Sequence, residues 1–191
     1  VEIEILPKVT MEFTTTDIEG LVVIEPKVFG DHRGYFFESF RQDRFADAVG
    51  YPVNFVQDYE SRSVKGVLRG LHFQLPPVAQ GKLVRVTKGA VLDVALDIRK
   101  DSPTFGKHFS IELNEDNKRQ LWIPPGFAHG FVSLMDDTVF QYKCTNYYSP
   151  ENECAILWSD SDLNIDWKLN DVTVSEKDKN ALTLANTQSP F

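Results

Sequence analysis

The chain has 191 residues, of which 42% are hydrophobic, and its 28 acidic and 20 basic residues give a net charge of −8. This size and composition predict one globular domain with a substantial core and argue against disorder. The acidic balance disfavours general nucleic-acid binding, which needs a basic surface. No apolar run is long enough to span a bilayer.

Two further features favour a cytoplasmic protein. The first ten residues, VEIEILPKVT, are mixed and charged and lack the apolar region of a secretory signal. Two cysteines, Cys144 and Cys154, are too few for a disulfide scaffold and lie in no zinc-binding spacing. We therefore expect two reduced thiols.

Strand patterns dominate the first half of the chain. Short runs of Val, Ile, Phe and Tyr are separated by Gly, Pro, Asn and Asp. One segment, Arg41–Val49, predicts a helix, because Phe45, Ala48 and Val49 share one face and Gly50 follows as a stop. The other predicted elements are strand Ile18–Glu25, loop Pro26–Gly34, strand Tyr35–Phe40, strand Val53–Glu60, and strands Val67–Gln74 and Lys82–Thr87 around a proline-rich turn.

The strand pattern continues through the second half. In Val91–Ile98 the apolar residues alternate with Asp93 and Asp97, which predicts an antiparallel strand with one solvated face. Later strands are predicted at His108–Leu113, Gln120–Ile123, Gly130–Leu134, Val139–Thr145 and Glu153–Leu157. After Trp158 the chain turns polar, with short helical turns expected in Asp160–Trp167 and Ser175–Asn180.

This regular spacing of short strands is typical of an all-β fold, a jelly roll or a small antiparallel β-barrel with a few short helices. No repeat, low-complexity linker or composition shift divides the sequence, so we expect a single domain over residues 1–191. Residues 1–16 are interpreted as an N-terminal arm that pairs with a neighbouring subunit, and residues 159–191 as a polar C-terminal segment.

The stretch Val67–Val86, VLRGLHFQLPPVAQGKLVRV, concentrates the residues suited to chemistry. Arg69 and His72 are three apart and would face opposite sides of a regular strand, but a glycine bulge at Gly70 would turn both toward one cavity. Lys82 follows on the next strand. An arginine and a lysine are rarely buried without an anion or a partner, which raises the interest of the histidine between them.

Other candidates have a structural alternative that the sequence leaves open. Tyr142 shares a strand face with Phe140 and Cys144, which suits either a core tyrosine or a general acid lining a cavity. His129, in IPPGFAHGF, is interpreted as a turn or loop histidine, satisfied by backbone or contacting a ligand. Arg33 with Glu38 would ordinarily be a solvated ion pair, and Asp178 a helix-start carboxylate.

Known cofactor and metal motifs are absent from the sequence. The four histidines, His32, His72, His108 and His129, are isolated and show no H-x-H or H-x-x-x-H spacing. No P-loop, dinucleotide fingerprint or G-x-S-x-G motif occurs. We therefore expect neither a bound metal nor a cofactor.

Several motifs together resemble one known family, the dTDP-4-dehydrorhamnose 3,5-epimerases. They are, in chain order, RGYFFESF, FVQD, VLRGLHFQ, QGKLVRV, DIRKDSPTFG, NKRQLWIPPGFAHGF, YKCTNYYSPENE and ILWSD. The match runs from about Ile18 to Asn180. The resemblance implies a cupin-type jelly roll, a homodimer, no metal, no cofactor and a dTDP-keto-sugar substrate.

The resemblance also implies roles for individual residues. His72 matches the catalytic base, Asp178 its partner carboxylate, Tyr142 the acid, and Lys82 the lysine beside the sugar carbonyl. Substrate-binding positions fall on Arg33, Glu38, Gln57, Tyr59, Arg69, His129, Glu153 and Lys177, and Tyr148 matches the tyrosine that stacks on thymine. One position departs from the pattern: Tyr59 stands where the family commonly has Asn.

Elementary chemistry agrees with these roles. Inversion of a carbon next to a ketone needs removal of a weakly acidic proton and its return to the opposite face. A histidine suits the base because its ordinary pKa of about 6.5 lies near neutral pH. A lysine would stabilise the enolate oxygen, and arginines would pair with the diphosphate.

The sequence leaves three alternatives open. A related dTDP-keto-sugar epimerase would invert one carbon only. A metal-dependent cupin enzyme would bind a transition metal, and a non-catalytic module would bind the nucleotide sugar without turnover.

Overall fold

The structure is a computed structural model that describes residues 11–191. The strands are β1 (Met11–Thr15), β2 (Val22–Pro26), β3 (Phe29–Asp31), β4 (Gly34–Phe36), β5 (Gln57–Ser63), β6 (Leu68–Gln74), β7 (Lys82–Lys88), β8 (Ala90–Asp97), β9 (His108–Asn114), β10 (Gln120–Ile123), β11 (Phe127–Ser133), β12 (Thr138–Cys144) and β13 (Glu153–Ala155). The helices are α1 (Gln42–Val49) and α2 (Glu176–Lys179), with single 3₁₀ turns η1 (Pro150–Asn152) and η2 (Leu184–Asn186).

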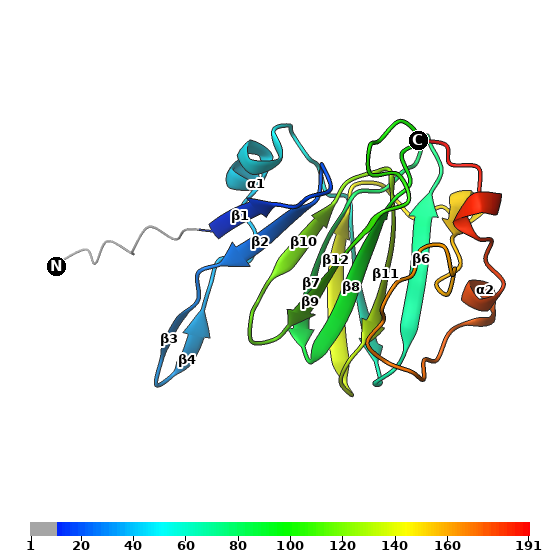
Figure 1. Cartoon of the computed structure of the whole chain (residues 1–191). Coiled ribbons are helices and arrows are strands. Elements are labelled where there is room, and N and C mark those ends of the chain that lie inside the picture. Colours follow the sequence, from blue (N-terminus) through cyan, green and yellow to red (C-terminus); the bar gives the residue numbers. More distant parts are fainter. Residues whose placement is uncertain (1–10) are drawn as a thin grey trace.

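Two antiparallel sheets face each other (Figure 1). The six-stranded sheet has the order β1-β2-β10-β7-β12-β5, and the five-stranded sheet has the order β13-β6-β11-β8-β9. Strands distant in the chain are neighbours in both sheets, as in a jelly roll. The prediction of an antiparallel all-β fold with a few short helices is confirmed.

The main core lies between the two sheets. Every second residue of the central strands points into it, including Val84, Val86, Leu121 and Phe131. Phe131 of one sheet stacks on Phe140 of the other, with 4.2 Å between ring centroids. Each such buried side chain contributes about 1.5–3 kcal/mol through removal of apolar surface from water. This contact spaces the sheets beside the polar cavity described below.

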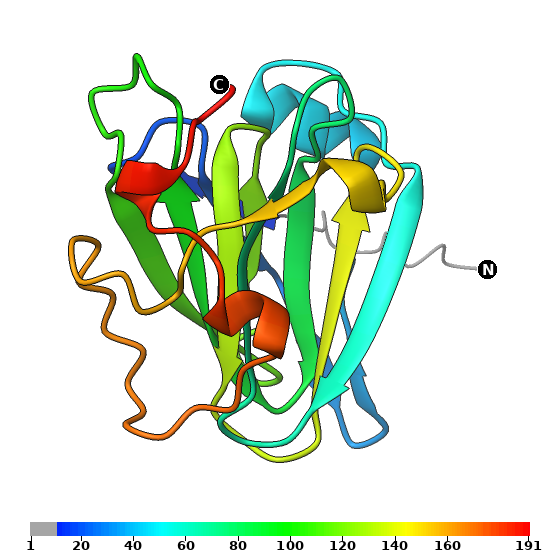
Figure 2. The same cartoon turned by 90° about the vertical axis from the view of Figure 1, so that its right-hand side faces the viewer.

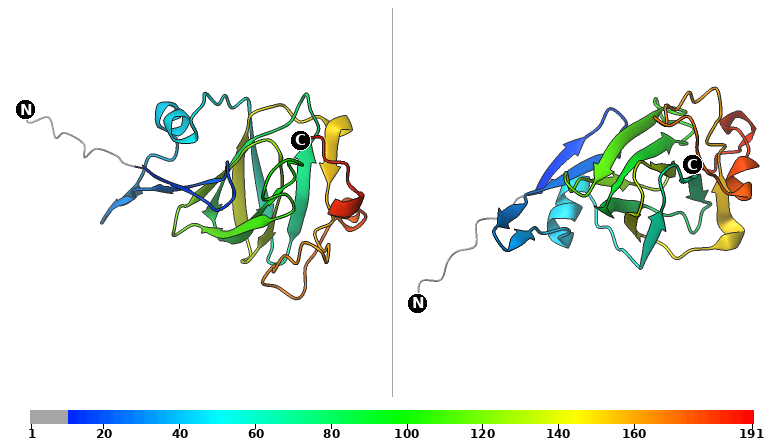
Figure 3. Two further views of the ribbon diagram at one scale, coloured as in Figure 1. Left: turned by 45° about the horizontal axis from the view of Figure 1, so that its top comes forward. Right: turned by 90° about the horizontal axis from the view of Figure 1, so that it is seen from below.

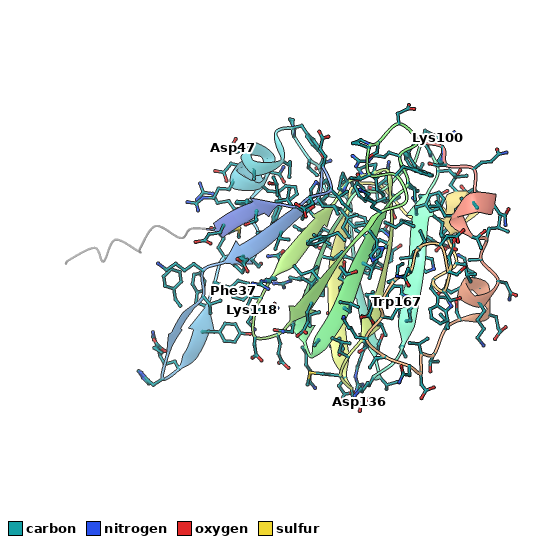
Figure 4. The ribbon with its side chains drawn as sticks, in the orientation of Figure 1. Phe37, Asp47, Lys100, Lys118, Asp136 and Trp167 are labelled. Carbon is teal, nitrogen blue, oxygen red and sulfur yellow. The ribbon has the colours of Figure 1, made fainter. Side chains whose placement is uncertain are left out.

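Strand β8 corrects one prediction from the alternating pattern. Its aspartates were expected on a solvated face, but all eight residues are buried. Leu92, Val94 and Leu96 share one face of the strand and pack against the C-terminal segment, where Trp167 lies in front of the sheet (Figure 4). Asp93 and Asp97 are fully buried on the opposite face. The alternating pattern shows which residues share a face of a strand. It does not show whether a distant segment of the chain covers that face.

Asp97 tolerates burial because five donors surround its carboxylate, one of them the Arg99 backbone amide at 3.0 Å. Arg99 binds it bidentately at 2.8 and 2.7 Å, and the hydroxyls of Ser102 and Thr104 donate at 2.6 and 2.7 Å. Burial alone would raise the pKa of Asp97, but these hydrogen bonds outweigh it and lower the pKa to about 2. The carboxylate therefore fixes the turn after β8.

The C-terminal segment packs against the outer face of the five-stranded sheet despite its polar composition. Leu163 and Trp167 belong to a second hydrophobic cluster there. The predicted helical turn near residue 175 is confirmed as α2, which Ser175 caps by accepting from the Asp178 amide. Residues 160–167, where another helical turn was expected, contain a plain turn. Figure 2 shows α2 in front of the strands on this side.

The predicted helix near residue 41 is confirmed as α1. Its stop is Gly50, whose left-handed backbone (φ 83°) lets the Gly50 amide donate to Ala46. Phe45 packs edge-on against Trp122 at 5.2 Å between centroids, which holds the helix on the outer face of the six-stranded sheet.

The segment before α1 differs from prediction. Residues 26–40 were expected to form a loop and then one strand, but β3 and β4 form a hairpin that projects from the body on the side opposite α2 (Figures 1 and 3). At its base Lys118 donates to the Tyr35 hydroxyl at 3.1 Å and lies beside Phe37 (Figure 4). The turn of this hairpin consists of four polar or glycine residues, Asp31–Gly34, and they show no hydrophobic pattern from which the hairpin could be predicted.

The N-terminal region is described in part. Residues 1–10 of the predicted arm lie outside the described residues. The remainder forms β1, which pairs with β2 of the same chain, and β2 is shorter than the strand predicted over residues 18–25. Cys144 and Cys154 are free thiols. Within residues 11–191 no helix has the length and apolar character needed to cross a membrane.

We expect Asp97→Asn to lower the free energy of unfolding by about 2 kcal/mol at neutral pH, because a pKa shift from 3.8 to about 2 corresponds to that difference. Since the pKa is lower in the folded chain, this stabilisation is complete above about pH 4 and is lost as the pH falls toward 2. Urea unfolding across this pH range measures it. Asp101→Asn, at an exposed position in the next turn, is the control. A difference that stays constant down to about pH 2 would contradict the role of the charge.

Candidate active site

A cavity of about 520 Å³ opens between the two sheets. Strands β6 and β11 of the five-stranded sheet form one wall, β5, β7 and β12 of the six-stranded sheet form the other, and the segment around α2 closes a side. The lining includes Ser61, Arg69, His72, Lys82, His129, Phe131, Phe140, Tyr142, Tyr148, Glu153, Lys177 and Asp178. An adjoining pocket adds Tyr59, Gln74 and Gln80 and shares His72, Lys82, Tyr142, Tyr148 and Glu153 with it.

A histidine and an aspartate form a dyad at the wall of this cavity. His72 Nε2 lies 2.6 Å from Asp178 Oδ1, although the two residues are 106 positions apart. Asp178 is 2% exposed, and its other oxygen accepts from the Gly70 amide at 3.4 Å. Burial opposes the charge on Asp178, but the bonds from His72, Gly70 and Ser175 outweigh it and hold its pKa below the ordinary value. Nδ1 of His72 is thereby left to accept a proton.

The predicted glycine bulge explains how Arg69 reaches the same cavity. His72 pairs with His129, whereas Arg69 pairs with Phe131, so three steps along β6 match two along β11. The bulge needs a glycine, because a Cβ on Gly70 would lie 2.4 Å from the Gly130 Cα. The two backbones therefore touch where the strand turns Arg69 toward the cavity.

Tyr142 lies on the opposite wall, on β12 of the six-stranded sheet. Its ring packs near Phe140 and Tyr59, with centroids 5.9 and 5.3 Å away. Burial raises the pKa of Tyr142 to about 12, so the phenol keeps its proton at neutral pH. The tyrosine and the dyad therefore face one cavity from different sheets.

Lys82 supplies a positive charge without a protein partner. Its ammonium has no hydrogen bond or ion pair with any side chain of residues 11–191. Burial lowers the pKa of Lys82, and the neighbouring acidic residues oppose this only in part. A cation of this kind is available for an anionic ligand or for a carbonyl oxygen that gains charge.

His129 corrects the interpretation of a loop histidine. It lies within β11, is 6% exposed and stands directly opposite His72 in the sheet register. Its Nε2 is 2.9 Å from Asp93 Oδ2, so Asp93 is a member of the site that the alternating pattern of β8 placed in solvent. Burial lowers the pKa of His129, with Asp93 opposing it, which favours a neutral ring at neutral pH.

A polar cluster borders the cavity mouth. The Tyr148 hydroxyl donates to Glu153 at 2.7 Å, and Lys177 of α2 pairs with the same carboxylate. Burial opposes the charge on Glu153, but the bonds from Lys177 and Tyr148 lower its pKa. Gln57 accepts from the Tyr148 amide at 2.7 Å and so joins this cluster.

Three predicted substrate-binding residues do not line the cavity: Gln57, which lies beside it through its bond to Tyr148, and Arg33 and Glu38, which lie farther away. Arg33 is an exposed residue of the β3–β4 hairpin and binds Asp31 bidentately. Glu38 lies between this hairpin and α1, and its Oε1 is buried without a hydrogen-bond partner among the described residues. The fold of one chain therefore separates both residues from His72.

Nowhere in the described part of the chain do three or more His, Cys, Asp or Glu side chains gather in a way that could hold a metal ion. His72 and His129 each face their own carboxylate, Asp178 and Asp93, and the geometry is that of two hydrogen-bonded pairs. The arrangement suits proton transfer: a base and an acid face one volume beside an unpaired cation.

Comparison with known proteins places this geometry in a family. The sequence profile of dTDP-4-dehydrorhamnose 3,5-epimerase matches residues 15–186. An enzyme of that name from Shigella flexneri is 57% identical over 170 residues, which is 89% of this chain and 94% of the relative. A dTDP-4-dehydrorhamnose 3-epimerase from Streptomyces niveus is 36% identical over 178 residues, which is 93% of this chain and 86% of the relative.

The fold gives the same result. A crystal structure of dTDP-6-deoxy-D-glucose-3,5-epimerase from Legionella pneumophila, in complex with dTDP-4-keto-L-rhamnose, matches with a TM-score of 0.90 at 50% identity and covers 94% of this chain and 95% of that one. Fold and site together define an isomerase with a cupin-like jelly roll. The chain belongs to the dTDP-4-dehydrorhamnose 3,5-epimerase family.

The polar cluster makes a testable prediction about Tyr148. Its hydrogen bond to Glu153 raises the pKa of the phenol to about 12. Glu153→Gln removes the negative acceptor, so we expect the pKa of Tyr148 to fall toward the ordinary 10.0. Carbon-13 NMR of ring-labelled tyrosine measures this titration. Glu176→Gln, on the exposed face of α2, is the control, and an unchanged titration in Glu153→Gln would show that the bond does not set this pKa.

Proposed function

We propose that the protein is a cofactor-independent epimerase that converts dTDP-4-dehydro-6-deoxy-D-glucose to dTDP-4-dehydro-L-rhamnose, within dTDP-L-rhamnose biosynthesis. One observation carries the proposal: the His72–Asp178 dyad and the Tyr142 phenol face the same cavity from opposite sheets. Epimerisation next to a ketone needs a base on one face of the sugar and an acid on the other. The family membership supplies the substrate class.

The first step is proton removal by His72. Its Nδ1 takes the proton from the carbon adjacent to the ketone, while Nε2–H stays bonded to Asp178. The electron pair of the broken C–H bond moves into the carbonyl and forms an enolate. Asp178 holds the ring in one tautomer and stabilises the imidazolium, because its carboxylate stays ionised at neutral pH.

Lys82 and Tyr142 complete the cycle. The ammonium of Lys82 stabilises the enolate oxygen, a contribution that is worth roughly 3–4 kcal/mol for a well-placed donor. Tyr142 then returns a proton to the opposite face of the carbon, and its raised pKa ensures that the phenol carries that proton. His72 then releases its proton to solvent and Tyr142 regains one, so the same cycle at carbons 3 and 5 inverts both centres.

The remaining residues of the cavity suit the nucleotide part of the substrate. Arg69 and Lys177 line the cavity, and their guanidinium and ammonium groups suit a diphosphate. Tyr148, exposed at the cavity mouth, offers its ring for stacking on thymine. His129 and Glu153 of the cavity, and Gln57 beside it, are assigned to polar contacts with the ligand. The free thiols of Cys144 and Cys154 suit the cytoplasmic location that the sequence predicts.

Heavy water tests the two-wall mechanism. We expect His72→Ala to lower both deuterium uptake and turnover by roughly 10²–10⁴-fold, because the base is lost. Tyr142→Phe should spare uptake more than net inversion, since the base still removes protons while the acid is missing. Mass spectrometry of the product, with NMR of its sugar carbons, measures both quantities.

The same measurement distinguishes the alternatives. Deuterium at one carbon only would identify a single-carbon epimerase, and binding without exchange would identify a non-catalytic module. Loss of activity with a chelator would favour a metal-dependent enzyme. Equal loss of uptake in Tyr142→Phe and His72→Ala would contradict the assignment of acid and base to separate walls.

We also propose that the protein acts as a homodimer in which the β3–β4 hairpin reaches the cavity of the other subunit. Tyr35 and Phe36 of the hairpin are 62% and 64% exposed, an apolar surface that a partner would cover. Arg33 is on the same hairpin, on the side of the molecule away from its own α2 (Figure 3). Arg33 lies far from the cavity of its own chain, but in a dimer it could bind the diphosphate in the cavity of the other subunit.

Mixed dimers test this arrangement. In this arrangement each site combines His72 of one chain with Arg33 of the other. A dimer of an Arg33→Ala chain with a His72→Ala chain therefore has one site that keeps both residues and one that lacks both. We therefore expect the mixture, after unfolding and refolding together, to regain activity that neither variant has alone. Light scattering measures the oligomeric state. A mixture as inactive as its components would place Arg33 and His72 of one chain in the same site or exclude the hairpin from it.

A further inference from the structure

Tyr59 and Tyr142 form a direct cross-strand pair. They stand opposite each other in the register of β5 and β12, and their rings are 5.3 Å apart at 34°. Opposed aromatic residues on neighbouring strands share a face and stabilise each other's orientation. The residue that departs from the family pattern thus contacts the assigned acid.

The other neighbours of Tyr142 on this face are fixed core residues. Val84 stands opposite on β7, and Phe140 and Cys144 flank it on β12; all three are buried. Beyond Tyr142 lies only β5, the edge strand of the six-stranded sheet. Tyr59 is therefore the side chain of this sheet that covers the phenol from the open edge.

The ring of Tyr59, and not its hydroxyl, makes this contact. Within residues 11–191 the Tyr59 hydroxyl has no hydrogen-bond partner, whereas its ring packs on Tyr142 and the residue lines the pocket beside His72 and Lys82. A ring at this position limits rotation of the Tyr142 side chain and keeps water from the side of the phenol that faces the edge strand β5. The raised pKa of Tyr142, which has burial as its main cause, is consistent with that shielding.

We propose that Tyr59 is a positioning residue, whose ring holds the Tyr142 phenol in the direction from which it returns a proton to the substrate. The inference rests on the proposed epimerisation. The enolate carbon can regain a proton from the His72 imidazolium, which restores the original configuration, or from Tyr142, which inverts it. Tyr59 favours inversion because it keeps the phenol aimed at the carbon.

The partition between exchange and inversion tests this role. With the dTDP-keto-sugar in heavy water, we expect Tyr59→Ala to raise the ratio of deuterium uptake to inversion roughly 10-fold, a smaller effect than the 10²-fold or greater loss expected on removal of an acid. Tyr59→Phe, which keeps the ring, should retain the wild-type ratio. Tyr51→Ala removes an exposed tyrosine next to α1 and is the control for loss of a surface ring.

A second measurement needs no turnover. The ring-flip rate of Tyr142, measured by NMR on carbon-13-labelled tyrosine in the free protein, should rise in Tyr59→Ala and stay low in Tyr59→Phe. Thermal unfolding of each variant shows that the fold is retained.

The outcomes separate the two proposals. A wild-type protein that exchanges no deuterium contradicts the proposed function. A wild-type protein that inverts the sugar while Tyr59→Ala keeps the same ratio contradicts the positioning role alone. If Tyr59→Phe changes the ratio as much as Tyr59→Ala, the hydroxyl contacts the substrate and the assignment to the ring is wrong.

Discussion

The hydrogen bond between His72 and Asp178 is the contact on which the site depends. It joins β6, the strand second from the edge of the five-stranded sheet, to the four-residue helix α2. A buried carboxylate is stable only with donors around it, and Asp178 has two: the imidazole of His72 and the Gly70 amide. Its backbone amide donates to the Ser175 hydroxyl, which holds the first turn of α2. The dyad therefore fixes α2 against the sheet as much as α2 fixes the imidazole.

The two-sheet fold places this dyad on one wall of the cavity and leaves the facing wall for the acid. Removal and return of a proton at one carbon require groups about a substrate's width apart on facing surfaces. Facing sheets provide this spacing, since their strands are held by the stacked pair Phe131 and Phe140. The cavity also gathers Arg69, Lys82 and Lys177 in a chain of net charge −8, so local cations offset the global repulsion of an anionic ligand.

Much of this was predictable from residues alone, and the exceptions have physical causes. The Gly50 stop of α1 and the glycine bulge at Gly70 are local signals, and the structure confirms both of them. Strand periodicity predicted most strands of the two main sheets but not the β3–β4 hairpin. The burial of Asp93 and the place of His129 within β11 depend on which distant segments cover a strand, and no local pattern carries that information. Arg33 was identified by resemblance as a binding residue, but its distance from the cavity follows from a hairpin whose direction only tertiary structure sets.

The position of Asp178 so late in the chain has a consequence for biosynthesis. All the strands of both sheets precede residue 156, so a nascent polypeptide can form the sandwich before α2 leaves the ribosome. Such an intermediate would expose the cavity with an unanchored imidazole. The imidazole therefore gains its carboxylate partner only when α2 docks against the sheet, so assembly of the dyad follows assembly of the strands.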